Sequence, residues 1–254
     1  MKTLTWQKPG QQNVAQELIK IIINYVAELR MKKNFHFKLL WNSFLFNLHY
    51  LPLKQAIKIP IFIYNPTYIS KLGTIKIEGH IKKGMIHLGK YSCPMYNKGI
   101  KWDNKGSIIF KGHCHIGNES FVSVGKNGIL TIGEDVTNTG KLKIICAKEI
   151  TIDEHNRLGW ETLIMDTSFH PLFDIEKQTF LPAIRSVHIG ANNWLGMQCV
   201  VMPGANTPEH CIFGLRSIIT RNAPIESYCT HGGTPLHIIR RNVKRILGKD
   251  QIEY

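Results

Sequence analysis

The fold class that the sequence predicts is mainly β, a parallel β-helix, and its clearest sign is a repeat of six residues. A helix repeats its buried face about every 3.6 residues and a strand about every 2, so neither explains this period. Six-residue repeats are typical of a solenoid whose turn has three short, flat faces. The positions on this register are Ile189, Leu195, Val201, Thr207, Phe213 and Ile219, and all but Thr207 are apolar.

Glycines support the same fold class. Glycine follows the register residue at Gly190, Gly196 and Gly214, where a corner needs close backbone approach or a positive φ. A β-rich domain that merely contains glycine is the alternative. A register kept over the five steps from Ile189 to Ile219 favours the β-helix.

The N-terminal residues 1–72 are expected to form a helical and packing region. From Gln11 to about Lys33, apolar residues recur at three- and four-residue spacing, which predicts an amphipathic helix. The stretch from Asn34 to Tyr64 is aromatic and dotted with lysine. It either packs between the helical region and the core or lies on a membrane interface, where Lys54 and Lys58 would contact anionic lipid.

The coils are expected to begin at Gly73 and to continue to residue 241. Ile116 and Val122 keep the six-residue step, and the register slips before Ile132. No change of composition marks a linker, so we predict one β-helix domain over residues 73–241. The register returns at Cys146, Ile152, Leu158 and Ile164.

Two stretches depart from the repeat. Met165 to Ser186 breaks the pattern and predicts a loop over residues 166–186, and such loops tend to carry the binding function. After Asn222, a proline, a Gly-Gly turn and a basic amphipathic stretch predict a helix that closes the end of the solenoid. Residues 242–254 are assigned to this C-terminal helix and tail.

Length and composition are those of a globular protein, with 254 residues, 43% apolar and 20% charged. The start, MKTLTWQKPGQQ, is too polar for a signal peptide, and no long apolar run lacks a charge. We therefore expect a cytoplasmic protein that neither is secreted nor spans a membrane. The cysteines lack a CxxC pair and are interpreted as reduced, core-filling thiols. They are Cys93, Cys114, Cys146, Cys199, Cys211 and Cys229.

The net charge of +14 at pH 7 calls for an anionic partner. Lysine and arginine are spread along the whole chain, without the basic run or aromatic stacking motif of nucleic-acid-binding modules. This spread argues against nucleic acid. A polyanionic cofactor, an anionic glycan or an acidic membrane surface accounts for the charge equally well.

The C-terminal half resembles a known superfamily. The segments NWLGMQCVVMPGA and GLRSIITRNAPIESYCTHGGTPLHIIRR resemble the hexapeptide-repeat acyltransferases, which have the left-handed β-helix fold. Within this superfamily the chain looks most like sugar O-acetyltransferases of the maltose and galactoside acetyltransferase type, and most of all those encoded with capsule or surface-polysaccharide enzymes. The match covers about Gly112 to Arg241. It implies a homotrimer that uses acetyl-CoA as co-substrate.

Two positions depart from the pattern of this superfamily. Thr207-Pro208 stands where an aliphatic-glycine pair is usual, and Leu215 stands where an alanine is usual. The first weakens a turn, and the second adds bulk beside the expected cofactor groove. Neither removes a chemical group, so the resemblance still implies the fold and the activity.

Acetyl transfer to a hydroxyl needs a base that takes the hydroxyl proton and donors that hold the oxyanion. His170, in DTSFHP, is the candidate base, since imidazole titrates near working pH and the HPL context resembles the catalytic histidine segment of the sugar acetyltransferases. Asp166 either fixes the imidazole tautomer, binds the acceptor sugar or caps a turn. Glu161 is a weaker candidate for the orienting role, and Asp174 is a candidate contact to the acceptor.

For the donor, the resemblance implies acetyl-CoA in the groove between two β-helices of a homotrimer. Small residues would let its extended arm approach the backbone, and guanidinium groups would bind its phosphates. The residues implied for the thioester arm and the pantetheine are Trp194, Gly196, Gly214 and Ser217. Those implied for the phosphates and the adenine are Arg221, Arg240, Thr234 and Pro235.

A catalytic metal is not expected. Left-handed β-helices that bind zinc use two histidines spaced by four residues, and no such pair occurs in this sequence. His113 and His115 alternate on one face of an expected strand, which is compatible with ligation but is more often exposed polarity.

The sequence therefore predicts an acetyl-CoA-dependent O-acetyltransferase acting on a sugar or surface-polysaccharide intermediate, with His170 as general base. A peripheral contact with the inner face of the membrane through the N-terminal region stays open. The alternatives are N-acetylation of an amino sugar or small amine, and a non-catalytic β-helix scaffold. No motif encodes which sugar or which hydroxyl is acylated.

Overall fold

The structure, a computed structural model, describes residues 37–91 and 98–248. The chain divides into two compact units, Met1–Trp41 and Asn42–Tyr254, and every labelled helix and strand lies in the second. The amphipathic helix expected from Gln11 to Lys33 lies outside the described residues. No helix in the described ranges is long and apolar enough to cross a membrane.

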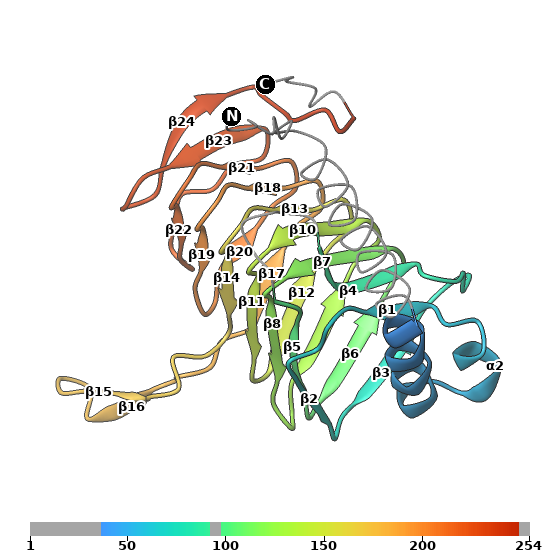
Figure 1. The fold of residues 1–254 in the computed structure, drawn as a ribbon. Coiled ribbons are helices and arrows are strands. Elements are labelled where there is room, and N and C mark those ends of the chain that lie inside the picture. The colour runs from blue at the N-terminus through green and yellow to red at the C-terminus, as the bar shows by residue number, and fades with distance from the viewer. Residues whose placement is uncertain (1–36, 92–97, 249–254) are drawn as a thin grey trace, which may run out of the picture. The chain divides into compact units, whose positions relative to one another are not determined.

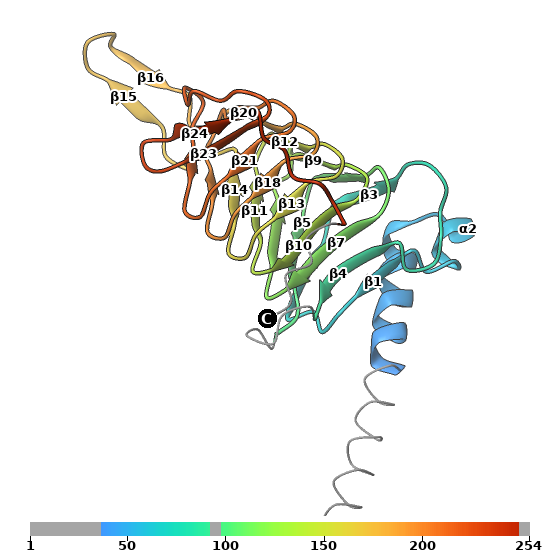
Figure 2. The same ribbon diagram turned by 90° about the horizontal axis from the view of Figure 1, so that it is seen from above.

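The second unit is a three-sided solenoid of parallel strands, which confirms the predicted parallel β-helix (Figures 1 and 2). Each coil contributes one strand to each of three sheets. The first sheet holds β1 (Ile61–Ile63), β4 (Ile86–Lys90), β7 (Cys114–Asn118), β10 (Val136–Gly140), β13 (Arg157–Leu158), β18 (Trp194–Leu195) and β21 (Ile212–Phe213), then β23 (Cys229–Gly232) and β24 (His237–Arg241). The second sheet holds β2 (Tyr68–Lys71), β5 (Lys101–Asn104), β8 (Phe121–Val124), β11 (Lys143–Cys146), β14 (Leu163–Met165), β19 (Val200–Val201) and β22 (Ile218–Ile219). The third sheet holds β3 (Thr74–Ile77), β6 (Ser107–Phe110), β9 (Ile129–Ile132), β12 (Glu149–Ile152), β17 (Val187–Ile189) and β20 (Asn206–Thr207).

The coils shorten along the chain, which explains why the six-residue register is visible only in places. In the second sheet, Phe121 pairs with Lys143 and Lys143 pairs with Leu163, so a coil first takes 22 residues and then 20. Val200 pairs with Ile218, so a late coil takes 18 residues, or three hexads. The register slips before Ile132 because the faces of the early coils are longer than six residues.

The coils stack aliphatic side chains in the interior, and asparagines bind the turns to one another. Asn193 donates from Nδ2 to the Thr207 hydroxyl oxygen over 2.9 Å and to the Pro208 carbonyl over 2.9 Å. The Gly190 N–H also donates to the Thr207 hydroxyl oxygen, over 3.2 Å. Thr207 is therefore buried with its hydroxyl satisfied, and the departure from the aliphatic register does not leave this turn unsupported.

The corners use non-glycine residues in the left-handed region, with φ of 51 to 61°. The corner between the first and second sheets has this conformation at Glu119, Lys141, Glu161, Gln198 and Arg216. The corner between the third and first sheets has it at Asp135, His155, Asn192, His210 and Tyr228. The three glycines singled out by the repeat do not supply these positive φ angles.

Close approach of the next coil is the reason for two of those glycines. A Cβ on Gly190 would lie 2.7 Å from the Thr207 carbonyl oxygen, and one on Gly196 would lie 2.9 Å from the Phe213 carbonyl oxygen. A Cβ on Gly214 would lie 3.4 Å from the nearest atom, an ordinary contact. Glycine is therefore required by stacking at residues 190 and 196 but not at 214.

The solenoid begins before Gly73, since β1 and β2 already belong to its first coil. A helix over residues 37–50 continues into the second unit, where its polar side chains bind the edge strand β1. Asn47 Oδ1 accepts the Ile61 N–H over 3.1 Å, and Ser43 Oγ accepts the Ile63 N–H over 3.1 Å. These bonds close an edge that would otherwise expose unpaired backbone groups.

Aromatic packing joins the same helix to the interior. Phe46 is buried with its ring 5.8 Å from Trp102, and the Trp102 indole donates to the Tyr50 hydroxyl over 3.2 Å. The short helix α2 (Leu53–Ala56) follows and buries Ala56. Residues 42–63 thus include the packing layer that was one of two interpretations of the aromatic stretch.

The prediction of a C-terminal helix that closes the solenoid is wrong over the described residues. The strands β23 and β24 form an antiparallel hairpin across the Gly232-Gly233 turn, and residues 242–248 contain no helix. The β-branched Ile238 and Ile239 suit a strand, and His231 and Ile238 are partners in the ladder. The hairpin adds its strands to the last coil at β21 and so covers the end of the first sheet.

Candidate functional site

The predicted loop emerges where the second sheet would turn into the third. The chain leaves the solenoid after β14 and returns at β17, and between them β15 (Leu172–Asp174) and β16 (Thr179–Leu181) form an antiparallel hairpin. A bridge between Thr167 and Ile184 closes its base. The hairpin projects away from the coils in both ribbon views (Figures 1 and 2).

His170 lies exposed at the base of this hairpin. Its imidazole makes no hydrogen bond or ion pair within the described residues. The backbone beside it is fixed, since Ser168 Oγ donates to the His170 carbonyl over 3.1 Å and Thr167 Oγ1 accepts the Phe169 N–H over 2.9 Å. The ring is therefore available to a ligand while its attachment point is held.

Asp166 is fully buried, and its carboxylate binds the preceding coil instead of the loop. Its carboxylate accepts the backbone N–H groups of Ala147, Lys148 and Glu149 over 2.7, 2.7 and 2.8 Å. These groups form the corner of the preceding coil. The expectation that Asp166 orients His170 or binds the acceptor is corrected by this geometry, because both carboxylate oxygens are bonded inside the protein and neither contacts His170.

The other two carboxylates also have structural partners. Asp174 Oδ1 accepts the N–H groups of Glu176 and Lys177 over 3.1 and 3.0 Å and so caps the hairpin turn. Glu161 accepts from Lys141 Nζ over 3.1 Å and from Gln198 Nε2 over 2.7 Å. Glu161 thus links neighbouring coils, and Asp174 holds the turn of the hairpin.

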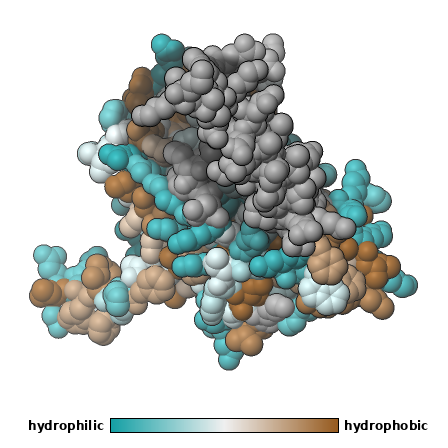
Figure 3. All heavy atoms as spheres, viewed as in Figure 1, coloured by the Kyte–Doolittle hydropathy of each residue, from teal (hydrophilic) through white to brown (hydrophobic). Residues whose placement is uncertain are grey.

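The hairpin exposes an unusual amount of apolar surface. Both faces of β15 and β16 are largely open, and brown apolar atoms cover much of the projecting lobe at the left of Figure 3. Phe173 and Phe180 pack edge to face with ring centroids 5.1 Å apart. The large exposed side chains are Phe169, Leu172, Phe173, Ile175, Phe180, Leu181 and Ile184.

Trp194 is the most accessible of the residues implied for the thioester arm and the pantetheine. It lies on the outer face of β18, 40% exposed, with the Arg245 guanidinium 4.6 Å from its ring centroid. Ser217 is buried, and its hydroxyl donates to the Gly214 carbonyl over 2.7 Å. Any contact of Ser217 with the donor would therefore come from its backbone, because its hydroxyl is bonded inside the coil.

Thr234 and Pro235 line a cavity of about 470 Å³ where the second sheet ends against the C-terminal hairpin. Ile218 and Thr220 form its opposite side. Arg240 is exposed on the neighbouring strand β24. This cavity brings together two of the implied donor residues.

Arg221 has a neighbour that the sequence did not reveal. The side chains of Arg221 and Arg185 both lie against Gly204, 3.2 Å from where its Cβ would stand. Gly204 has φ of 83° and no side chain, which leaves room for both. Arg185 precedes β17 at the end of the inserted loop, so only the stacking of coils brings these two side chains against the same glycine.

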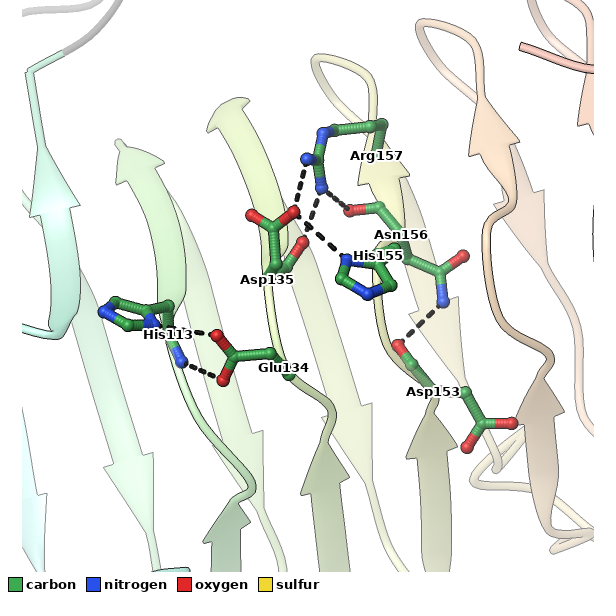
Figure 4. Close-up of polar contacts among 7 residues, drawn as sticks. All are labelled: His113, Glu134, Asp135, Asp153, His155, Asn156 and Arg157. Atoms are coloured by element: carbon green, nitrogen blue, oxygen red, sulfur yellow. Dashed lines mark hydrogen bonds and ion pairs between the residues drawn. The ribbon is translucent and has the colours of Figure 1, made fainter. Parts of the chain in front are cut away.

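A second polar cluster lies at the corner between the third and first sheets (Figure 4). His113 Nδ1 lies 2.7 Å from Glu134 Oε1, and His155 Nδ1 lies 3.3 Å from Asp135 Oδ2. Arg157 Nη2 also donates to Asp135, over 2.6 Å. The described residues contain no group of three ligands placed for a metal ion.

His115 differs from these paired histidines. Its Nε2 is buried without a partner, and its ring lies 6.0 Å from that of His87. Burial, with lesser repulsion from Lys90 and His87, lowers the pKa of His115 to about 4. The lowered pKa keeps this half-buried histidine neutral at neutral pH.

Five of the six cysteines are buried, free thiols, as predicted. The sixth, Cys93, lies outside the described residues. Burial raises the pKa of Cys199 to about 11, and burial with the nearby Asp166 raises that of Cys146 to about 12. Such thiols are core fillers and not nucleophiles.

No family model matches this chain. A chloramphenicol acetyltransferase of Agrobacterium fabrum is 32% identical over 71 residues, which are 28% of this chain and 32% of that protein. A polysialic acid O-acetyltransferase of Escherichia coli O1:K1 is 24% identical over 119 residues, 46% of this chain and 38% of that protein. The chain thus matches only about a third of the length of these curated relatives.

Two solved structures overlap more of the chain at lower identity. The polySia-specific acetyltransferase NeuO has a TM-score of 0.44 and 18% identity, covering 74% of this chain and 82% of its own. A maltose O-acetyltransferase from Clostridium difficile 630 has a TM-score of 0.37 and 15% identity, covering 70% and 71%. The two curated relatives are acetyltransferases, and the resemblance predicted from the C-terminal half of the sequence is confirmed at that level.

Proposed function

We propose that this chain is an acetyl-CoA-dependent O-acetyltransferase that acts on a sugar or surface-polysaccharide hydroxyl, with His170 as general base. The observation that carries the proposal is the exposed, unpartnered imidazole of His170 on the one long insertion into the described coils. The loop precedes the coils that hold Trp194 and the cavity beside Thr234 and Pro235. The names of the relatives add sugar and polysaccharide acceptors to the chemistry that fits.

In the proposed reaction, one proton passes from the acceptor to the enzyme and then from the enzyme to the leaving group. Acetyl-CoA, when bound, supplies the acyl group as a thioester. A His170 ring nitrogen takes the proton of the acceptor hydroxyl while the hydroxyl oxygen bonds to the acyl carbon. The same nitrogen then gives that proton to the departing sulfur, so the base returns to its starting state.

Thr167 and Ser168 are the proposed positioning residues for His170, because Asp166 is committed to the coil. Ser168 Oγ contacts both the His170 carbonyl and the Ala183 carbonyl, at 3.1 and 3.3 Å. Together with the Thr167 bond to the Phe169 N–H, these contacts tie the two arms of the loop at its base. They hold the backbone of the base and leave the ring to be oriented by the bound acceptor or by a second subunit.

The donor residues fit acetyl-CoA in outline. The apolar cavity beside Pro235 suits a purine ring, and the exposed Arg221 and Arg240 suit phosphates. Trp194 offers an aromatic face toward the other end of the donor. Gly214 leaves open space, since even an added Cβ would make only ordinary contacts there.

The hairpin supports assembly as a homotrimer, with a second copy of this chain as the partner. An isolated two-stranded hairpin is marginal in water, and this one leaves Ile175, Phe180 and Leu172 each more than half exposed. Packing against a neighbouring solenoid would bury these side chains and carry His170 to a groove between subunits. In this proposal the solenoid domain begins with β1 at Ile61, before the predicted limit at Gly73.

The proposal extends to a cell compartment and a pathway. We take the enzyme to be cytoplasmic and to serve capsule or surface-polysaccharide synthesis, with peripheral contact at the inner face of the membrane through residues before the first coil. The free, buried thiols of five cysteines suit a reducing compartment.

The test combines turnover with donor binding. His170→Ala should lower acetyl transfer by about 10² to 10⁴-fold, while calorimetry still detects acetyl-CoA binding. Products from a panel of sugars and amino sugars are scored as ester or amide. Unchanged turnover in His170→Ala would contradict the role of the base, amide products would favour an N-acetyltransferase, and no acetyl-CoA binding would favour a scaffold.

A further inference from the structure

The outer face of the second sheet carries an ordered row of aromatic and basic side chains. The register pairs Tyr68 with Lys101, Lys101 with Phe121, and Phe121 with Lys143. Neighbouring strands lie about 4.8 Å apart, so the two lysines stand about 10 Å from each other with an aromatic ring between them. We call these four residues the aromatic-lysine row.

Lys101, Phe121 and Lys143 of this row line two adjoining hollows of about 340 and 480 Å³, and Tyr68 lies next to Lys101 at the edge of the first hollow. Both are lined by Glu119 and Lys143, so they form one continuous groove across the sheet. The first hollow is lined by Thr67, Lys98, Gly99, Lys101, Glu119, Phe121 and Lys143. The second is lined by Glu119, Lys141, Lys143, Glu161, Leu163, Gln198 and Val200.

The charge of the groove is positive and in part uncompensated. Lysines outnumber glutamates four to two among the lining residues. One ion pair is internal, since Lys141 Nζ contacts Glu161. Lys101 and Lys143 are exposed and make no ion pair or side-chain hydrogen bond within the described ranges. Two ammonium groups are thus left to attract an anion.

The same row leads to the proposed donor cavity. Beyond Lys143 it continues through Leu163 and Val200 to Ile218, and Ile218 lines the cavity beside Pro235. The paired residues on this sheet therefore run from the basic groove to the end at which the donor is proposed to bind. A long acceptor could lie along one sheet face with one unit at the donor.

From this arrangement we propose that the aromatic-lysine row is the acceptor track for an acidic glycan, binding several sugar units through their anionic groups and ring faces. Aromatic rings offer flat apolar surfaces to the C–H faces of sugars, and ammonium groups spaced between them pair with carboxylates or phosphates. The proposal rests on the proposed function and specifies its substrate as an anionic polymer and not a free monosaccharide.

The binding test uses the full chain, with no need for turnover. Polysialic acid as a carboxylate glycan, poly(glycerol phosphate) as a phosphate polymer and dextran as a neutral one are titrated at low salt by calorimetry. We expect one of the acidic polymers to bind and dextran not to bind. Lys101→Gln with Lys143→Gln should weaken that binding at least fivefold, and Tyr68→Ser should weaken it about twofold to tenfold.

The matched control removes the same charge elsewhere. Lys111→Gln with Lys126→Gln neutralises two exposed lysines outside the groove and should change binding less than twofold. Binding of neither acidic polymer, or an equal loss in the control, would overturn the proposal. Equal competition by single-stranded DNA would also overturn it, since it would mark a general polyanion surface.

The acceptor track and the proposed enzymatic function can be refuted independently of each other. Glycan binding and acetyl-CoA binding are measured separately on the same protein. Loss of acetyl-CoA binding with intact glycan binding would count against the enzyme and leave the track standing. Normal turnover with no effect of the lysine substitutions on acceptor binding would count against the track alone.

Discussion

Asp166 and His170 lie four residues apart, on either side of the point where the chain leaves the solenoid, and their surroundings are opposite. Asp166 is fully buried, and three backbone N–H groups of the preceding coil bind its carboxylate. His170 is exposed, and its ring has no partner within the described residues. The difference teaches that the coils satisfy their own polar groups, while the insertion presents groups whose partners must come from elsewhere.

The largest effect on stability should come from Asp166→Ala, because three buried N–H groups lose their acceptor together. We expect the free energy of unfolding to fall by about 3 kcal/mol in chemical denaturation. Asp166→Asn keeps one acceptor oxygen and should lose less. A change below about 0.5 kcal/mol in Asp166→Ala would break the contrast between the two regions.

Two glycines test whether close stacking of the coils requires glycine at a given position. Gly196→Ala places a methyl group 2.9 Å from the next coil and should cost about 1 to 3 kcal/mol. Gly214→Ala meets nothing closer than 3.4 Å and should cost less than about 0.5 kcal/mol. Thermal unfolding of the two variants checks the order, and equal losses would contradict the stacking argument.

Acid should weaken the solenoid through His115. Its folded pKa of about 4 lies below the ordinary value of 6.5, so the unfolded chain binds more protons between these two values. The stability contributed by neutral His115 is therefore present above about pH 6.5 and is lost as the pH falls toward 4. Denaturation at pH 7 and pH 4.5 should show a smaller difference in His115→Gln than in the parent, and an equal difference would contradict this role.

Substitutions in the hairpin should leave the stability of the coils almost unchanged but should clearly reduce assembly. Ile175→Ser with Phe180→Ser changes side chains that are 79% and 67% exposed, so little packing within the chain is lost. Light scattering should report a trimer for the parent and a monomer for this variant. The matched control is Leu53→Ser in α2, where the leucine is 67% exposed and the mass should not change.

The contrast also separates what the sequence could predict from what it could not. The late coils have 18 residues, so the hexad of Ile189, Leu195 and Val201 shows in the sequence, and the insertion shows as its interruption. The first coil is longer, since Ile61 pairs with Ile86 and Tyr68 pairs with Lys101, and this length hid the strands before Gly73. A period visible in the sequence therefore reports the length of each face as well as the fold.

Side-chain roles that depend on a neighbouring coil were beyond the sequence. Asp166 binds a corner about 20 residues earlier, and Arg185 meets Arg221 only because coils stack. The resemblance implies that Ser217 flanks the pantetheine, yet its hydroxyl is bonded inside the turn. The final HIIRR stretch allows a basic helix face or a strand, and pairing with β23 decided the strand.

The most direct test of the account measures turnover and stability together in His170→Ala. The account predicts that acetyl transfer falls by at least about 100-fold while the free energy of unfolding stays within about 0.5 kcal/mol of the parent. Turnover that is retained, or a loss of activity accompanied by unfolding of the coils, would contradict the division between a self-sufficient solenoid and a catalytic insertion.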